Sequence, residues 1–144
     1  MVKIGKNLSE WSSYSCQPKT RSELIDIIDD RIVKDGPNCD LNDIDTSLIT
    51  DMSWLFVSST FNGDISEWDV SKVENMEKMF LNSKFNGDIS KWNVSKVIYM
   101  DYMFYESEFN KDISKWKINK NCDITGIFYG CPIEEEFEPK SLQL

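Results

Sequence analysis

The sequence has no histidine among its 144 residues, and its four cysteines include no pair in the CxxC spacing. These absences exclude most transition-metal sites and every catalytic triad that uses a histidine base. Long apolar runs are missing too: the opening MVKIGKNLSEWSSYS has no signal-peptide core, and no later segment approaches the length of a membrane span. We therefore expect no enzyme, no metal site and a chain that stays in the compartment in which it is made.

Positive charge is also scarce. The formal net charge is −9 and the pI is near 4.5. A protein that binds nucleic acid needs a basic face to neutralise phosphates, so we do not expect nucleic acid as a partner. The acidic balance mainly favours solubility.

The four cysteines are Cys16, Cys39, Cys122 and Cys131. Disulfides are rare in chains without an export signal, so we expect free thiols. An oxidised pair of Cys122 and Cys131, nine residues apart, would staple the end of the repeat region.

A segment of 13 residues occurs three times in similar form. FNGDISEWDVSKV begins at Phe61, FNGDISKWNVSKV at Phe85 and FNKDISKWKINKN at Phe109, so the copies are 24 residues apart. A degenerate earlier copy, DLNDIDTSLITDMSWLF, begins at Asp40. A fixed period of this length is typical of stacked repeats, in which each unit buries its apolar face against its neighbours.

Within one unit the apolar spacing changes. Ile89, Trp92 and Val94 follow a strand pattern, whereas the steps of three and four residues from Val97 to Phe104 indicate a helical or 3₁₀ turn. Each unit is therefore predicted to contain a short strand, a turn and a short helix. The Asn-Gly-Asp sequences mark the loops between units.

A helix is predicted within KTRSELIDIIDDRIVKDGP, from Lys19 onward. Thr20 and Glu23 form a capping-box pattern, and Gly36 with Pro37 ends the helix. We interpret this helix as a cap that covers the open face of the first repeat.

These residues together are recognisable. FNGDISxWxVSKVxxMxxMF, preceded by DLNDIDTSLITDMSWLF and followed by FYGCP, resembles the repeat of BspA-type leucine-rich-repeat proteins. Such repeats are also frequent in Mycoplasma surface lipoproteins and in some bacteriophage and large-virus genomes. The resemblance covers roughly residues 20–132. It implies a parallel-strand solenoid used for protein recognition, without enzymatic activity or cofactor.

We accordingly expect one α/β domain over residues 1–144: a short leucine-rich-repeat solenoid with a parallel strand and a short helix per repeat. Residues 1–38 would form an N-terminal segment with a capping helix, residues 39–131 about four repeats, and residues 132–144 a C-terminal cap or tail.

Several residue types recur every 24 positions, and each recurrence has a structural interpretation. Trp68, Trp92 and Trp116 are expected in the core, as are the regularly spaced methionines. The aspartates of the ladder Asp40, Asp64, Asp88 and Asp112 are expected to serve turns rather than calcium, and Asn62, Asn86 and Asn110 to form an internal hydrogen-bond spine.

The residues that flank the core tryptophans are predicted to point outward, and they vary where the core does not. From unit to unit they change from acidic to basic. We hypothesise that they contact a protein partner; the alternative is a solvated face without a partner. The predicted partner-binding residues are Glu67, Asp69, Lys91, Asn93, Lys115 and Lys117.

The expected function is that of a non-enzymatic protein–protein interaction module. It would act in the cytoplasm of the producing cell or as a phage or virus accessory: an inhibitor, an adaptor or a virion component. The alternative is a BspA-type surface adhesin whose export signal is absent from this sequence. We expect no membrane partner, no cofactor and no metal.

Overall fold

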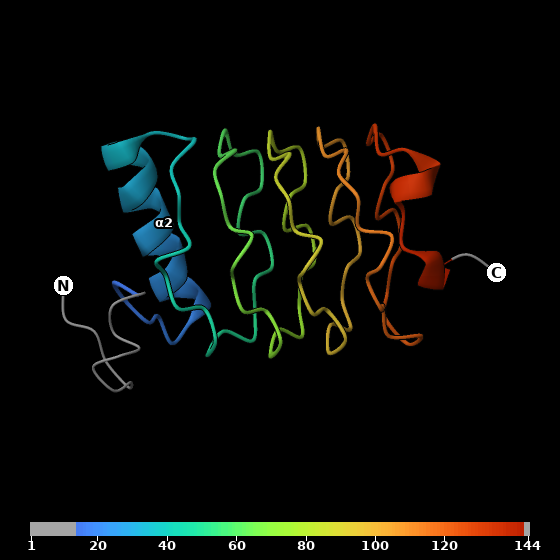
Figure 1. The fold of residues 1–144 in the computed structure, drawn as a ribbon, viewed down its shortest axis with the longest axis horizontal. Coiled ribbons are helices and arrows are strands. Elements are labelled where there is room, and N and C mark those ends of the chain that lie inside the picture. The colour runs from blue at the N-terminus through green and yellow to red at the C-terminus, as the bar shows by residue number, and fades with distance from the viewer. Residues whose placement is uncertain (1–13, 143–144) are drawn as a thin grey trace.

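The computed structural model describes residues 14–142. The repeats lie side by side as successive coils of the chain, between a helix at one end and short helical turns at the other (Figure 1). The helix is α2, Arg21–Asp35, and the turns are the 3₁₀ helices η1, Glu135–Phe137, and η2, Lys140–Leu142. Residues 1–13 of the predicted N-terminal segment lie outside the described residues.

The predicted strand and helix in each repeat are wrong. Residues 14–142 contain no sheet, only isolated parallel bridges such as Asn75 with Tyr99, and none of the described helices lies within residues 39–131. The expected α/β leucine-rich-repeat solenoid is therefore not the fold. The repeats stack as coils made of turns.

The hydrogen bonds explain why an apolar spacing of three and four residues was wrongly interpreted as a helix. In the second coil the amides of Met76, Lys78, Phe80 and Asn82 donate to carbonyls of the next coil at 2.7–3.0 Å. The amides of Met79, Leu81 and Ser83 donate three residues back at 3.1–3.2 Å. This alternation produces a spacing of three to four residues in burial without any helix. We name residues 52–58, 76–82, 100–106 and 124–130 the turn side of the coils.

The opposite part of each coil, residues 64–70, 88–94 and 112–118, is named the tryptophan side. Here the Trp92 amide donates to the Ile89 carbonyl within the same coil at 3.2 Å, so no strand ladder forms. The indole Nε1–H of Trp92 instead donates to the Ile65 carbonyl of the previous coil at 3.1 Å. Trp68 and Trp116 make the corresponding bonds, and all three tryptophans are at most 4% exposed. The core interpretation of these tryptophans is confirmed.

Phenylalanine columns fill the space between the two sides. Phe56, Phe80 and Phe104 stack with ring centroids 5.5 Å apart along the column, and a second column contains Phe61, Phe85 and Phe109. The methionines predicted for the core are all fully buried: Met52, Met76, Met79, Met100 and Met103. Full burial of one such side chain contributes about 1.5–3 kcal/mol, so the core is the main source of stability.

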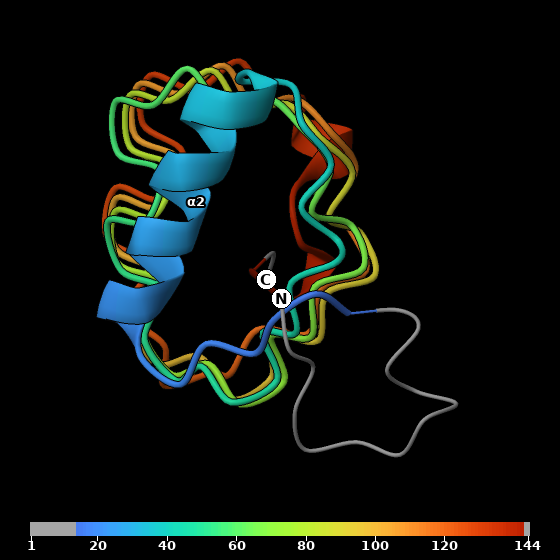
Figure 2. The ribbon, with the colours of Figure 1, turned by 90° about the vertical axis from the view of Figure 1, so that its left-hand side faces the viewer.

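Helix α2 forms as its sequence predicts. Thr20 is the N-cap and its hydroxyl accepts from the Glu23 amide at 3.1 Å, while the Glu23 carboxylate accepts from the Lys19 amide at 2.8 Å. Gly36, with φ of 90°, ends the helix and donates to the Ile32 carbonyl. The buried face of α2 covers the turn side of the first coil (Figure 2).

Two arginines fasten α2 to the first coil. Arg31 Nη1 lies 2.9 Å from Asp43 Oδ2, and Arg31 Nη2 donates to the Asp40 carbonyl. Burial alone would raise the pKa of Asp43, but hydrogen bonds from Ser15 and Arg31 hold it below its ordinary value. Arg21 Nε donates to the Ser53 carbonyl at 2.5 Å.

The C-terminal segment covers the other end on the opposite side. The Ile113 amide donates to the Phe137 carbonyl at 3.0 Å, and the Lys140 amide donates to the Ser114 carbonyl at 3.1 Å. Figure 2 shows η1 and η2 over the tryptophan side, across the coils from α2. The two ends of the stack are thus covered on different sides.

We predict that Trp92→Ala lowers the free energy of unfolding by about 3–5 kcal/mol, because it opens a cavity in the core. Trp92→Phe keeps a ring but leaves the Ile65 carbonyl without its donor, at a cost of about 1–3 kcal/mol. Urea unfolding of both variants measures these losses. A Trp92→Ala protein as stable as the parent would contradict the packing described here.

We predict that Asp43→Asn destabilises the protein by about 1–2 kcal/mol at pH 7, because it weakens the bond to Arg31. The folded-state pKa of Asp43 is lowered, so its contribution is present above the unfolded pKa and is lost as pH falls through the folded value. The difference from the parent should therefore shrink towards pH 3.

Urea unfolding at both pH values tests this prediction. The matched control is Asp30→Asn, because Asp30 forms an exposed pair with Lys34 at 3.9 Å, and exposed pairs contribute little. A loss of stability that did not depend on pH would contradict the role of the Asp43 carboxylate.

Candidate interaction surfaces

The tryptophan side carries the residues predicted to bind a partner. Glu67, Lys91 and Lys115 occupy equivalent positions in successive coils, as do Asp69, Asn93 and Lys117, and all six are exposed. The neighbouring indoles of Trp92 and Trp116 stack 6.4 Å apart, which sets these rows side by side. The structure brings the predicted residues together on one surface.

Their side chains are not equally free. The Asp69 carboxylate accepts from the amide and hydroxyl of Ser71, and the Asn93 amide oxygen does the same for Ser95. These two residues hold turns. Lys91, Lys115 and Lys117 form no ion pair with any described residue, so their charge faces solvent.

The aspartate ladder has the predicted turn role. Oδ1 of Asp64, Asp88 and Asp112 accepts from the amide of the serine two residues later, each at 2.9 Å. Hydrogen bonds from those serines lower the pKa of all three carboxyls. Within residues 14–142 no three acidic, cysteine or histidine side chains come together as metal ligands.

The asparagine ladder is the predicted hydrogen-bond spine. Oδ1 of Asn62 accepts from the Asn86 amide at 2.8 Å, and Oδ1 of Asn86 accepts from the Asn110 amide at 2.8 Å. Asn110 continues the spine to the Glu134 amide at 3.0 Å. The spine therefore joins the last coil to the C-terminal segment.

A second surface, on the turn side, was not predicted. Trp54, Lys78, Tyr102 and Gly126 occupy one position in successive coils, with φ of 60°, 53°, 56° and 62°. The Lys78 ammonium lies 4.4 Å from the Trp54 ring centroid and 5.8 Å from that of Tyr102. The Tyr102 ring covers Gly126, where an added Cβ would lie 2.6 Å from it. This row is a continuous outer layer of rings around one cation.

Tyr105 and Tyr129 extend this layer. Their rings stack at 5.2 Å, and Tyr105 meets Tyr102 edge to face at 5.6 Å. Trp54 is 40% exposed and Tyr129 is 65% exposed. We name Trp54, Lys78, Tyr102, Tyr105 and Tyr129 the aromatic face.

Three carboxylates lie on the same turns as the aromatic face. Glu77, Asp101 and Glu106 lie on the same turns, and Lys78 is the one basic residue on the turn side. Burial raises the pKa of Asp101, and repulsion from Glu77 and Asp123 adds to the shift. The surface is therefore aromatic and electronegative, which suits a cationic ligand.

The sequence did carry a signal for this surface. The position of residue 54 in the repeat is occupied by Trp, Lys, Tyr and Gly in the four successive units. The adjacent core positions are always methionine, leucine, isoleucine or phenylalanine. Left-handed backbone at Lys78 or Tyr102 is not visible in sequence, because neither is glycine.

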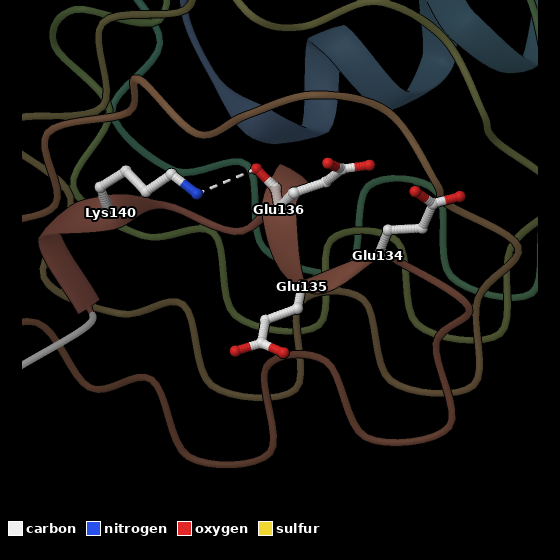
Figure 3. A pocket seen from close by; sticks show the side chains of 4 residues that line it. All are labelled: Glu134, Glu135, Glu136 and Lys140. Atoms are coloured by element: carbon white, nitrogen blue, oxygen red, sulfur yellow. Dashed lines mark hydrogen bonds between the residues drawn. The ribbon is translucent and has the colours of Figure 1, made fainter.

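Acidic side chains gather at the C-terminal end of the stack. Glu134, Glu135, Glu136 and Lys140 line a shallow hollow, in which Lys140 Nζ donates to the Glu136 carbonyl at 3.1 Å (Figure 3). A hydrogen bond with Glu134 and repulsion from it raise the pKa of Glu136. The carboxylate of Glu135 points away from the other two (Figure 3).

The four cysteines are free thiols, as expected. Burial raises the pKa of each of them, and that of Cys122 reaches about 11. Thiols with raised pKa values carry little thiolate at neutral pH, so they are poor nucleophiles.

Comparison with known proteins places the chain. The family model described as "Mycoplasma protein of unknown function, DUF285" matches residues 31–138. The chain belongs to this family. The match begins inside α2 and ends in the C-terminal segment, so it spans the whole stack. No curated protein and no solved structure matches the chain.

The family description names no activity, so it supports the Mycoplasma part of the resemblance and leaves the role to the surfaces described above. None of the helices within residues 14–142 has the length and apolar character needed to cross a membrane.

We predict that iodoacetamide alkylates Cys122 in the folded protein more than about tenfold more slowly at pH 8 than in urea, because little thiolate is present. The raised pKa stabilises the folded state below the unfolded thiol pKa, and this contribution is lost as pH rises through about 11. Peptide mass spectrometry measures the labelling. Equal rates in the folded and unfolded protein would contradict a half-buried thiol with a raised pKa.

Proposed function

We propose that this protein is a non-enzymatic protein-interaction module and that its aromatic face binds a basic surface of another protein. The description of the family names no activity, and the structure gives the frame, a stack of repeats. The aromatic face gives the chemistry. Exposed rings with carboxylates on the same turns support the binding of a cationic group.

The observation that carries this proposal is the placement of large aromatic residues where the coil does not need them. Left-handed backbone costs a residue with a side chain about 1–2 kcal/mol, and the last unit meets the same requirement with Gly126. Trp54 and Tyr102 therefore occupy positions that glycine would fill with less strain. Tryptophan and tyrosine are enriched among the residues that dominate binding energy at protein interfaces.

The charge pattern gives the chemistry of the partner. Lys78 already lies between two rings, which shows that this face accommodates a cation. The adjacent Tyr105–Tyr129 pair has no cation over it within the described residues, and Glu106 lies close in sequence. An arginine or lysine of a partner would find both a ring face and a carboxylate there.

The charged rows of the tryptophan side are a second candidate surface for the same function. Lys91, Lys115 and Lys117 are exposed and unpaired within the described residues. These lysines suit an acidic partner surface, in contrast to the aromatic face. Charge of this kind sets the orientation and association rate of a complex more than its affinity.

We predict that Trp54→Ala with Tyr129→Ala weakens partner binding by at least about 30-fold, which corresponds to the loss of one hot spot of about 2 kcal/mol, because tryptophan and tyrosine are enriched among hot spots. The tagged parent captures the partner from a lysate of the native host, and mass spectrometry identifies it. Titration of the purified partner then gives the dissociation constants. A basic partner should dissociate more readily as salt concentration rises.

The matched control reverses Lys91, Lys115 and Lys117 to glutamate, which alters the other side of the coils. Thermal melts show whether each variant remains folded. Loss of binding only in the lysine variant would assign the function to the tryptophan side. Unchanged binding in both variants would overturn the proposal for either lateral surface.

A further inference from the structure

The backbone of the turn side has a single direction. In the first coil the amides of residues 52, 54, 56 and 58 donate to carbonyls of residues 75, 77, 79 and 81 at 2.8–2.9 Å. The next two coils repeat this pattern, with amide donors at residues 76–82 and then 100–106. Each set of amides points toward the C-terminal end of the stack, and each set of carbonyls points back. The ladder is therefore polar, like the backbone of a helix.

Within residues 14–142 the ladder ends at the fourth coil. No described residue accepts a hydrogen bond from the amides of Ile124, Gly126, Phe128 or Gly130, which are the equivalents of the donors in the three preceding coils. Two of the four are glycines, and side chains of the previous coil, Tyr102 and Glu106, fold over them. An unpaired row of backbone groups is a ready template for another chain.

The apolar core beside these amides is also partly exposed at this end of the stack. The phenylalanine column ends with Phe128, which stacks on Phe104 at 5.8 Å but is only partly buried, unlike the earlier members. The C-terminal segment covers the tryptophan side of the last coil, where Phe137 and Lys140 bond. Within the described part of the chain, no hydrogen bond joins residues 132–142 to residues 124–130. Donors and an apolar ring thus share one open edge.

The other end of the stack shows how such a ladder is completed. There α2 covers the turn side, and Arg21 donates to the outward carbonyl of Ser53. The carbonyl end thus has a cationic donor, whereas the amide end has no described acceptor. A second copy is a poor complement, because its open edge offers the same donors and its carbonyl end lies beneath α2.

We propose that the turn side of the last coil, residues 124–130, is a docking edge for a polypeptide segment of a partner protein. The segment presents carbonyl oxygens on alternate residues to the four free amides and places an apolar side chain on Phe128. This is the arrangement that residues 123–129 provide for the third coil. It is peptide recognition by addition to an open edge.

Charge further defines the segment. Glu106 and Asp123 lie at the edge, Glu134–Glu136 lie at the same end of the stack, and Lys140 bonds to the Glu136 carbonyl. Basic side chains on the docking segment would meet this acidic end. The docking edge shares Tyr129 with the aromatic face, but the proposal rests on the edge amides and Phe128, whereas the aromatic face extends to Trp54 in the first coil.

The probe is a blocked peptide with the sequence of residues 74–84, ENMEKMFLNSK, because its carbonyls fill this role in the second coil. Nitrogen-15 NMR of the whole protein follows the amides of Gly126 and Gly130 during titration. Before peptide is added, the four edge amides should exchange with solvent at least about 100-fold faster than those of Met100, Tyr102, Phe104 and Glu106.

Millimolar peptide should shift both glycine signals and slow exchange of the edge amides at least about tenfold. A version with both glutamates replaced by lysine should bind more tightly at low salt, because the end of the stack is acidic. Phe128→Ala should weaken peptide binding, whereas Trp54→Ala, at the far end of the stack, should not.

A scrambled peptide that gives the same shifts would overturn the proposal, and so would edge amides that stay unshifted and unprotected. Protection that appears without peptide and grows with protein concentration would instead assign the edge to a second copy. Normal peptide binding by Trp54→Ala would show that the docking edge binds independently of Trp54. A failure of the proposed function of the aromatic face can therefore be told apart from a failure of this proposal.

Discussion

The one-way hydrogen-bond ladder of the turn side is the constraint on which the rest of the structure depends. Every second amide leaves its own coil, so the intervening amides must close tight turns, and the chain is pushed into left-handed backbone at residues such as Lys78 and Asn82. Those turns place methionine and phenylalanine inside at intervals of three and four. The core columns follow from the ladder, because each coil repeats the register of the one before.

The ladder also explains why the outer surface is free to vary. Backbone hydrogen bonds and the phenylalanine column join the coils on the turn side, and the outward side chain at the position of Trp54 takes part in neither. The same position accepts Lys78, Tyr102 and Gly126. Side chains that the packing of the coils does not require can vary to suit a binding function, and those of the aromatic face are of this kind.

Local and periodic signals could be predicted from the sequence, whereas the path of the backbone could not. The helix cap at Thr20, the core tryptophans and the asparagine spine follow from residue type and the 24-residue register, and the structure confirms them. The strand and helix were wrong because the apolar spacing from Val97 to Phe104 does not reveal where each amide donates. The exposure of the charged rows was predictable from alternation around Trp92, but the aromatic face depends on positive φ at residues other than glycine.

Polarity makes the two ends of the stack chemically different. Each peptide unit has a dipole, and on the turn side the amides of successive coils point the same way, so carbonyls face α2 and amides face the last coil. At the carbonyl end Arg21 donates to the Ser53 carbonyl, and Glu134–Glu136 lie at the amide end. The edge strand of an ordinary β-sheet presents both N–H donors and C=O acceptors to an added strand. Here the described amide edge offers donors, so a segment added in the proposed way must supply acceptors.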